Sequence, residues 1–240
     1  MRVESPGFFD LQLNGYGGVD FNDPSVTPED VSRALDALQD TGVTRCLPTL
    51  ITSSFEDFAA SARAVVACGH PAVAGLHMEG PYISPDDGPR GAHPRAWVRE
   101  ASRDGFERRQ EAAEGRIRLV TLAPEVPGTL PLIEHLVGRG VRVAIGHSGA
   151  SKEAITNAVS AGASMSTHLG NGCADILPRH PNVLWTLPGG SATLKFVGRT
   201  AREAEREAIA YLREAVYHVI DQLEGDDILS IVVFDQSARV

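Results

Sequence analysis

Residues 141–170 read VRVAIGHSGASKEAITNAVSAGASMSTHLG and contain one complete strand-helix-strand unit. Short apolar runs at 141–145 and 164–168 are typical of buried strands. The stretch 151–161 between them has the length and apolar spacing of an amphipathic helix. A strand, a helix and a second strand in this order predict two parallel neighbouring strands joined by a crossover helix.

The same stretch carries its own boundary signals and two histidines. Ser151 suits the N-cap of the helix, and Gly162 suits its exit. His147 follows the first strand and His168 ends the second. Because the carboxyl ends of parallel strands meet at one edge of a sheet, this arrangement brings the two imidazoles close together. Barrels built from parallel strands and helices hold their active sites at this edge.

The alternation of strands and helices extends over most of the chain. Strands are predicted at 7–13, 43–51, 73–77, 117–122, 141–145 and 164–168. Helices are predicted at 28–41, 54–68, 99–114, 129–139 and 151–161. We therefore expect an α/β fold, an incomplete (β/α)8 TIM-type barrel of about six βα units.

The last part of the chain departs from this rhythm. A closed barrel needs eight strands, and the sequence after Leu184 does not supply two more obvious βα units. Pro188-Gly189-Gly190-Ser191 has a linker composition. We expect a partial barrel at 1–187 and, at 188–240, a linker followed by a helix-strand tail.

Composition and charge exclude several partners. The chain has 240 residues and a formal net charge of −9, without a basic stripe, which argues against nucleic acid as a partner. No apolar run is long enough for a membrane span and no signal peptide is recognised, so a cytoplasmic protein is expected. The 3 cysteines are scattered and odd in number, which fits reduced thiols better than disulfides or a thiolate zinc site.

A third polar residue completes a metal-ligand set. Glu79 follows the third strand, and Gly80-Pro81 after it forces a sharp turn. One carboxylate and two imidazoles, His147 and His168, are the ligands of a catalytic zinc that keeps one position open. Other divalent metals accept the same ligands. The alternative for each residue taken singly is a hydrogen-bonded structural role.

Five sequence blocks, in this order, resemble successive signatures of the N-acetylglucosamine-6-phosphate deacetylase family of the amidohydrolase superfamily. The blocks are PGFFDLQLNGYGGVDF (6–21), GLHMEGPY (75–82), GAH (91–93), GHS (146–148) and THLGN (167–171). The resemblance implies deacetylation of N-acetylglucosamine 6-phosphate to glucosamine 6-phosphate and acetate. A small phosphorylated amino sugar is then the expected partner.

In that family the corresponding Glu and two His hold the metal, which implies Glu79, His147 and His168 as ligands. Many amidohydrolases carry His-x-His after the first strand for a second metal. This chain has Gln12-Leu13-Asn14 there, so one divalent ion, zinc first, is expected.

The resemblance also implies substrate contacts. His93 would polarise the amide carbonyl, and Asn171 and Gly172 would seat the sugar phosphate. Arg179 corresponds to an arginine that reaches the substrate of a neighbouring subunit, which implies a homodimer. Against these readings, His93 could be an ordinary loop residue and Arg179 a surface charge. For His77 a supporting or core role is expected rather than ligation.

The sequence leaves the family pattern after residue 186, and the family's general-base Asp is not found. Activity of this chain could therefore be impaired. Asp235, at the end of a strand-like run, is a speculative stand-in for the base. The stretch 208–235 resembles the first helix and following strand of a von Willebrand factor A domain, from which no adhesion function is inferred.

Two other functions stay open at this stage. One keeps the metal and the reaction but changes the sugar, for example to the galactosamine isomer. The other is a catalytically inactive chain that acts only as a binding module. An open barrel exposes strand edges, which favours self-association.

Overall fold

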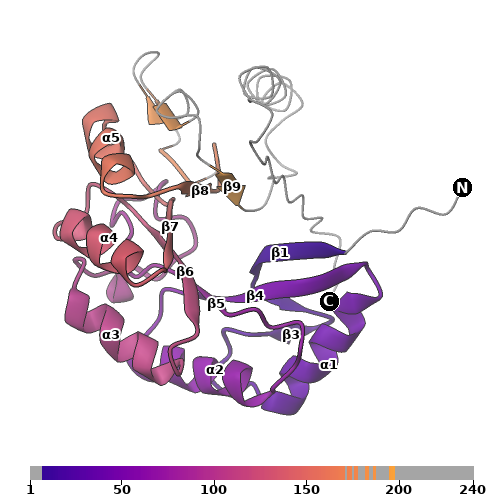
Figure 1. The fold of residues 1–240 in the computed structure, drawn as a ribbon. Coiled ribbons are helices and arrows are strands. Elements are labelled where there is room, and N and C mark those ends of the chain that lie inside the picture. Colours follow the sequence, from indigo (N-terminus) through magenta and orange to yellow (C-terminus); the bar gives the residue numbers. More distant parts are fainter. Residues whose placement is uncertain are drawn as a thin grey trace, which may run out of the picture.

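The computed structural model describes residues 7–170, 172–174, 176–177, 182–183 and 186–187, and the backbone of 195–197. Its main sheet has 7 strands in the order β1-β4-β5-β6-β7-β8-β9, and each neighbouring pair is parallel. The strands are β1 (Phe8–Leu13), β4 (Val43–Ile51), β5 (Leu76–Glu79), β6 (Ile117–Leu122), β7 (Arg142–Ile145), β8 (Met165–Thr167) and β9 (Lys195–Val197). The sheet curls as an incomplete barrel (Figure 1), which confirms the predicted fold class.

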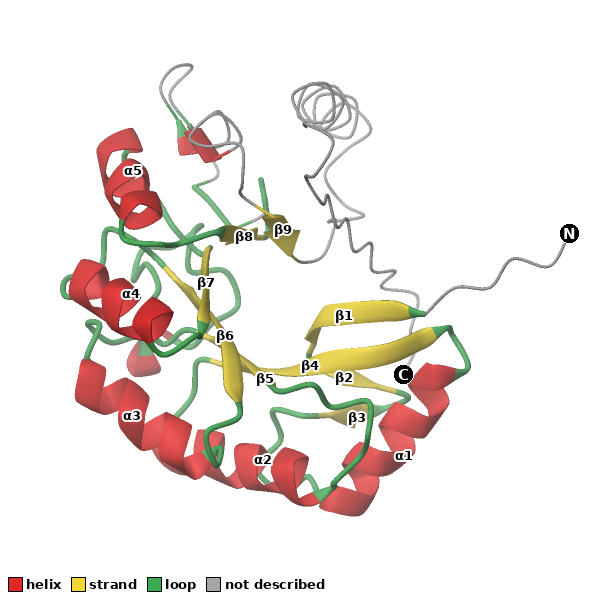
Figure 2. Ribbon diagram, in the orientation of Figure 1, coloured by secondary structure: helices red, strands yellow, loops and turns green. Residues whose placement is uncertain are grey.

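The helices cover the outer, convex face of the sheet (Figure 2). They are α1 (Pro28–Gln39), α2 (Phe55–Ala67), α3 (Arg103–Ala112), α4 (Thr129–Gly138) and α5 (Lys152–Ser160), with a 3-10 turn η1 (Arg95–Trp97) before α3. The buried residues of α1 are Val31, Ala34, Leu35 and Leu38. This i, i+3, i+4, i+7 spacing puts one apolar stripe against the sheet, as expected of an amphipathic helix.

Local signals set the helix boundaries. Ser151 caps α5, since its side chain accepts a hydrogen bond from the backbone N–H of Ala154. Gly162 follows with φ +110, and a Cβ there would lie 2.9 Å from Cγ2 of Val137. The predicted start and exit of this helix are therefore confirmed, and the exit requires glycine for both conformation and space.

The structure differs from the sequence prediction at four main places. The helix predicted at 99–114 begins only at Arg103 and ends at Ala112, because the backbone N–H groups of Arg99 and Ala101 donate to the carbonyls of Pro81 and Pro127 instead of joining a helix. β9 adds a seventh strand beside β8. It was not predicted, because three residues are too few to show the alternating apolar pattern of a strand. β2 (Gly15–Tyr16) and β3 (Val19–Asp20) form a small antiparallel hairpin that was not predicted. β5 starts at Leu76 rather than at the predicted Val73, because Val73 makes only an isolated bridge to Cys46. It ends at Glu79, two residues later than predicted. Residues 188–194 and 198–240 lie outside the described residues, so the boundary and the tail stay predictions.

Strand side chains alternate between two environments. The larger apolar core packs between the sheet and the helices, and it includes Val120, Val143 and Ile145. Their strand neighbours Leu119 and Ala144 belong to a second, smaller cluster with Leu47 and Met165. Because successive side chains of a strand point to opposite faces, the smaller cluster fills the inner, concave side of the sheet. The functional side chains lie above it on that side.

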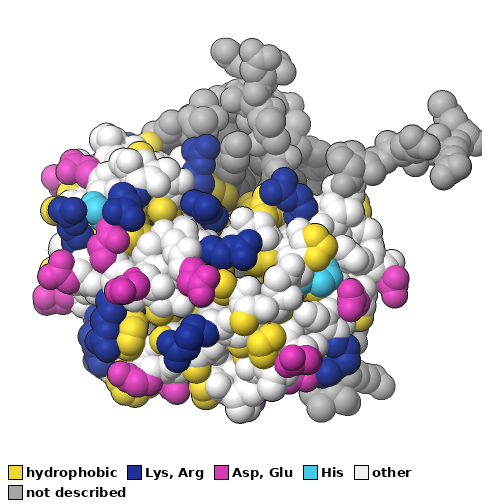
Figure 3. All heavy atoms as spheres, turned by 60° about the horizontal axis from the view of Figure 1, so that its bottom comes forward, with side chains coloured by type: hydrophobic (Ala, Val, Ile, Leu, Met, Phe, Trp, Pro, Cys, Tyr) yellow, Lys and Arg dark blue, Asp and Glu magenta, His cyan; other side chains and the backbone are white. Residues whose placement is uncertain are grey.

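Surface charges, cysteines and helix apolarity bear on the sequence predictions. On the face shown in Figure 3, basic and acidic side chains are interspersed rather than gathered in one patch. No disulfide joins Cys46, Cys68 or Cys173, all three of which the structure describes. Among the helices described, none combines the length and apolarity of a bilayer span.

Candidate metal centre

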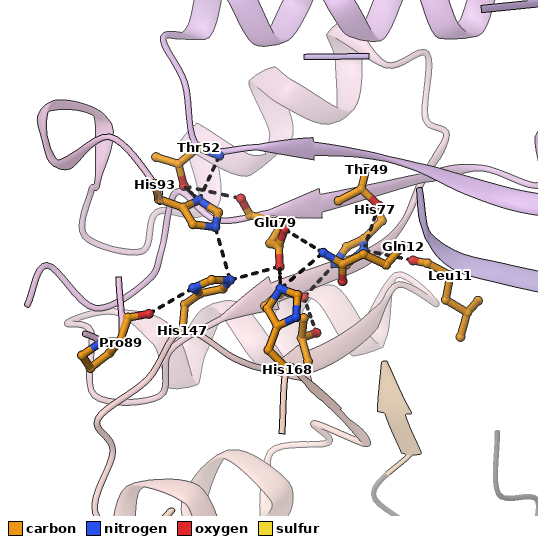
Figure 4. A network of polar contacts seen from close by, with 12 residues as sticks. Leu11, Gln12, Thr49, Thr52, His77, Glu79, Pro89, His93, His147 and His168 are labelled. Carbon is orange, nitrogen blue, oxygen red and sulfur yellow. Dashed lines mark hydrogen bonds and ion pairs between the residues drawn. The ribbon is translucent and has the colours of Figure 1, made fainter. Parts of the chain in front are cut away.

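Three side chains from separate strands converge at the carboxyl ends of the sheet (Figure 4). Glu79 is the last residue of β5, His147 lies just after β7 and His168 directly follows β8. A ligand atom of each lies within 4.8 Å of the other two. Among the described residues this is the group of three or more acidic, His or Cys side chains that is arranged to hold a metal ion.

The carboxylate of Glu79 lies between the two imidazoles. Its Oε1 is 2.8 Å from Nε2 of His168 and 3.1 Å from Nε2 of His147. Ligand atoms bonded to zinc at about 2.0–2.1 Å in tetrahedral geometry are separated by about 3.3 Å. A divalent cation would therefore require these atoms to separate by only a few tenths of an ångström.

The hydrogen bond on the far side of His147 fixes which nitrogen is available. Nδ1 of His147 lies 3.0 Å from the carbonyl oxygen of Pro89. A carbonyl only accepts, so Nδ1 donates, and in the neutral ring Nε2 carries the lone pair. Figure 4 shows this nitrogen turned toward Glu79. A backbone carbonyl on the other ring nitrogen is the usual support of a metal-binding histidine.

Burial and polar contacts have opposite effects on the pKa of Glu79, whose side chain is 3% exposed. Burial acts to raise the pKa of Glu79, but its close contacts with His147 and His168 outweigh burial and hold the pKa well below its ordinary value. The group is thus held as a carboxylate, the form that binds a cation.

Gln12, at the carboxyl end of β1, takes part in the site in a way that the sequence did not reveal. Its Nε2 donates to Oε2 of Glu79 over 2.8 Å, on the carboxylate oxygen that the imidazoles do not use. Its Oε1 is buried, with no hydrogen-bond partner among the described residues. Sequence reasoning treated Gln12 only as a missing ligand, whereas the structure makes it a partner of Glu79.

His93 reaches the site from the loop between β5 and α3. It is 4% exposed, and its Nε2 lies 3.2 Å from Nε2 of His147. The backbone N–H of Thr52 donates to Nδ1 of His93 over 3.3 Å, so the proton of the neutral ring sits on Nε2. Burial, and then the nearby His147, lower the pKa of His93 to about 4. A neutral imidazole therefore presents a donor N–H beside the three predicted ligands.

His77 is not part of the ligand set. It is 0% exposed, with Nδ1 3.1 Å from the carbonyl oxygen of Leu11 and Nε2 2.7 Å from Oγ1 of Thr121. Burial lowers the pKa of His77 to about 4. Both ring nitrogens are thus used in a polar layer beneath the site, which agrees with the core role expected for it.

The two imidazoles stand on unusual backbone. His147 has φ 51 and His168 has φ 54, in the left-handed region that residues other than glycine rarely adopt. Gly172 links the two loops, because its N–H donates to the carbonyl of His168 at 3.1 Å and its carbonyl accepts from the N–H of Ser148 at 3.0 Å. A Cβ at Gly172 would lie 3.1 Å from the backbone nitrogen of His147.

The remaining predicted residues fall in different places. Gly172 lies beside the imidazoles as described, and its proposed contact with a phosphate stays a prediction. Asn171, Arg179 and Asp235 lie outside the described residues, and so does the stretch that resembles part of a von Willebrand factor A domain.

The curled parallel sheet with outer helices is a fold that this chain shares with solved N-acetylglucosamine-6-phosphate deacetylase structures. The comparisons with known proteins are more specific. The human N-acetylglucosamine-6-phosphate deacetylase is 39% identical over 78% of this chain and 47% of its own length. The N-acetylgalactosamine-6-phosphate deacetylase of Shewanella sp. (strain ANA-3) is 38% identical over 74% of this chain and 45% of its own length.

Solved structures agree with the sequence comparison. A Mycobacterium smegmatis N-acetyl-D-glucosamine-6-phosphate deacetylase variant, in complex with N-acetyl-D-glucosamine-6-phosphate, matches with a TM-score of 0.79 and 30% identity. The match covers 89% of this chain and 55% of that one. No protein-family model matches the chain. The chain spans about half the length of the curated relatives it matches. The human relative and the Mycobacterium smegmatis structure are N-acetylglucosamine-6-phosphate deacetylases, and the resemblance seen in the five sequence blocks is confirmed.

Proposed function

We propose that this chain carries the metal-binding part of an N-acetylglucosamine-6-phosphate deacetylase and acts on the acetamide of that sugar phosphate. The observation that carries the proposal is the convergence of Glu79, His147 and His168, within 4.8 Å of one another, beside a donor N–H from His93. The substrate is the one named for the human and Mycobacterium smegmatis relatives.

The ligand assignment follows from the donor set. Glu79, His147 and His168 would hold one divalent cation, for which zinc is our proposal because two imidazoles and a carboxylate suit it. When bound, such an ion lowers the pKa of a coordinated water and polarises the amide carbonyl. Gln12 keeps the second oxygen of Glu79 occupied at 2.8 Å, which directs the carboxylate's other oxygen toward the imidazoles.

His93 would act on the substrate carbonyl. The N–H of Thr52 keeps Nδ1 of His93 as an acceptor, so the proton is on Nε2, which faces Nε2 of His147 over 3.2 Å. With that nitrogen of His147 bound to a cation, the Nε2–H of His93 would donate to a substrate oxygen placed beside it. A buried donor that is already oriented stabilises the negative charge that develops on this oxygen in the transition state. Because burial lowers the pKa of His93 to about 4, the ring would serve as a hydrogen-bond donor and not as a cation at neutral pH.

The proton acceptor of the reaction is not assigned among the described residues. Asp235 stays a hypothesis for it, and Asn171, Gly172 and Arg179 stay hypotheses for phosphate binding. If no base is supplied, the chain binds metal without turnover, as a binding module would. A homodimer, with Arg179 reaching the partner's substrate, and a cytoplasmic location are further parts of the proposal.

The galactosamine isomer is the second candidate substrate. The Shewanella N-acetylgalactosamine-6-phosphate deacetylase is 38% identical to this chain, against 39% for the human protein. Overall identity therefore does not separate the two epimers, and the reaction class is the same for both.

Acetate release after addition of one equivalent of zinc tests the proposal. Each sugar phosphate is offered separately to the whole chain, with Glu79→Gln as the variant that weakens the cation site. Glu134→Gln, an exposed carboxylate on α4, is the matched control. We expect turnover in the wild type and in the control and none in Glu79→Gln. Metal binding without acetate from either sugar would support the binding module, and turnover unaffected by Glu79→Gln would refute the proposal.

A further inference from the structure

A carboxylate outside the ligand set holds the loop that carries His147. Glu125 lies in the loop after β6, 23 residues before Ser148. Its Oε2 accepts a hydrogen bond from Oγ of Ser148 over 2.7 Å, and its Oε1 accepts one from the backbone N–H of Gly149 over 2.7 Å. The two oxygens thus bridge the two residues that directly follow His147.

Ser148 extends this contact into a network across three loops. Its Oγ accepts from the backbone N–H of Ala150 over 3.0 Å. Its backbone N–H donates to the carbonyl of Gly172, whose own N–H donates to the carbonyl of His168. The loops after β6, β7 and β8 are therefore connected through groups that neighbour both imidazoles.

The backbone at His147 needs such support. With φ 51, a residue that is not glycine sits in a sparsely populated conformation, which persists only when its surroundings impose it. The carbonyl of Pro89 restrains the ring from one side, and the bonds from Glu125 restrain the chain immediately after it. Hydrogen bonds to an ionised carboxylate are shorter and stronger than those between neutral groups.

We propose that Glu125 is a positioning residue that fixes the direction of the His147 imidazole toward the cation site. This inference rests on the proposed metal site, since it concerns how well one ligand is aimed. Partners that orient a ligand typically contribute 10- to 100-fold to metal affinity. A merely structural role for Glu125 would instead lower stability and leave the affinity of the folded protein unchanged.

Three single variants and one double variant separate these roles. Glu125→Ala removes both acceptors, so we expect zinc to bind about 10- to 100-fold more weakly. Glu125→Gln keeps one oxygen for the N–H of Gly149 but turns an NH2 group toward Ser148, so an intermediate loss is expected. Ser148→Ala removes the hydroxyl partner. If the bond between them transmits the effect, the losses in Glu125→Ala and Ser148→Ala are less than additive in the double variant.

The experiment uses the full chain and zinc or cobalt alone. Zinc affinity is measured by competition with a chromophoric chelator, and the d–d spectrum of the cobalt form reports ligand geometry. In the metal-free protein, long-range proton-nitrogen correlation spectra report whether Nδ1 of His147 carries the proton. Thermal unfolding of each variant checks folding, and Glu134→Gln is the control carboxylate.

We expect weaker zinc binding, an altered cobalt spectrum and a mixed tautomer at His147 in Glu125→Ala, all unchanged in Glu134→Gln. Unchanged affinity, spectrum and tautomer in folded Glu125→Ala and Glu125→Gln would overturn the inference. If the wild type binds no metal, the proposed function fails, and the His147 tautomer alone then decides whether Glu125 orients this ring.

Discussion

Replacing Asp10 with asparagine should stabilise the protein at neutral pH. Asp10 lies on β1 and is 3% exposed. Burial raises its pKa to about 6, although the backbone N–H of Gln12, which donates to Oδ1 over 2.9 Å, acts in the opposite direction. Asparagine keeps an oxygen that can accept this bond and removes the charge.

The magnitude follows from linkage. The folded pKa lies about 2 units above the 3.8 of the unfolded chain, and each unit corresponds to about 1.4 kcal/mol. Between pH 3.8 and 6 the unfolded chain releases its proton first, so the stability contributed by neutral Asp10 is present below pH 3.8 and is lost as pH rises through 6. Asp10→Asn should therefore match the wild type near pH 3.5 and exceed it at pH 7 by up to about 3 kcal/mol.

Chemical denaturation at several pH values, with chelator present to exclude metal effects, measures this difference. A gain of about 3 kcal/mol would raise the melting temperature by about 6–12 °C for a chain of this size. Asp86→Asn, at an exposed position, is the control and should change neither curve. Zinc affinity should stay unchanged, because the bond to Gln12 is kept. Parallel stability curves for Asp10→Asn and the wild type between pH 3.5 and 7 would refute the reasoning.

Three further outcomes are expected. Zinc at 100 times its dissociation constant should raise the free energy of unfolding of the wild type by about 2.7 kcal/mol. The same zinc concentration should raise that of Glu79→Gln by less than half as much. Denaturant titrations with and without zinc measure both values. Gly146→Ala should cost about 1–3 kcal/mol in the same titrations, because its Cβ would lie 2.8 Å from Cβ of Thr167; an unchanged midpoint would contradict the packing. Since burial lowers the pKa of His77 to about 4 from 6.5, neutral His77 contributes stability above pH 6.5 that is lost as pH falls to 4, about 3 kcal/mol at most. His77→Asn should reduce the change in the free energy of unfolding between pH 6.5 and 4 by that amount. A pH dependence as steep as that of the wild type would show that His77 does not titrate as described.

The order of strands and helices in the main sheet could be predicted because the sequence signals for them are local. Ser151 and Gly162 mark a helix through hydrogen bonding and backbone conformation within a few residues. His147 and His168 were placed together because parallel strands bring their carboxyl ends to one edge whatever the details of packing. The same reasoning placed Glu79 correctly, although its strand was predicted to end two residues too early.

The features that were missed depend on contacts between distant segments. β9 is recognisable as a strand only through its pairing with β8. Gln12 meets Glu79 across 67 positions of sequence, and Glu125 meets Ser148 across 23. No local pattern distinguishes a glutamate that bridges two residues of another loop from one without such partners, so these contacts emerged only when the topology was known.

X-ray absorption at the zinc edge of the stoichiometrically loaded wild-type chain tests the central claim most directly. The account predicts one zinc per chain, with two imidazole nitrogens and oxygen ligands at about 2.0–2.1 Å, and loss of one imidazole signal in His168→Ala. A zinc environment without imidazole, or one that His168→Ala leaves unaltered, would contradict the assignment of Glu79, His147 and His168 to a single cation.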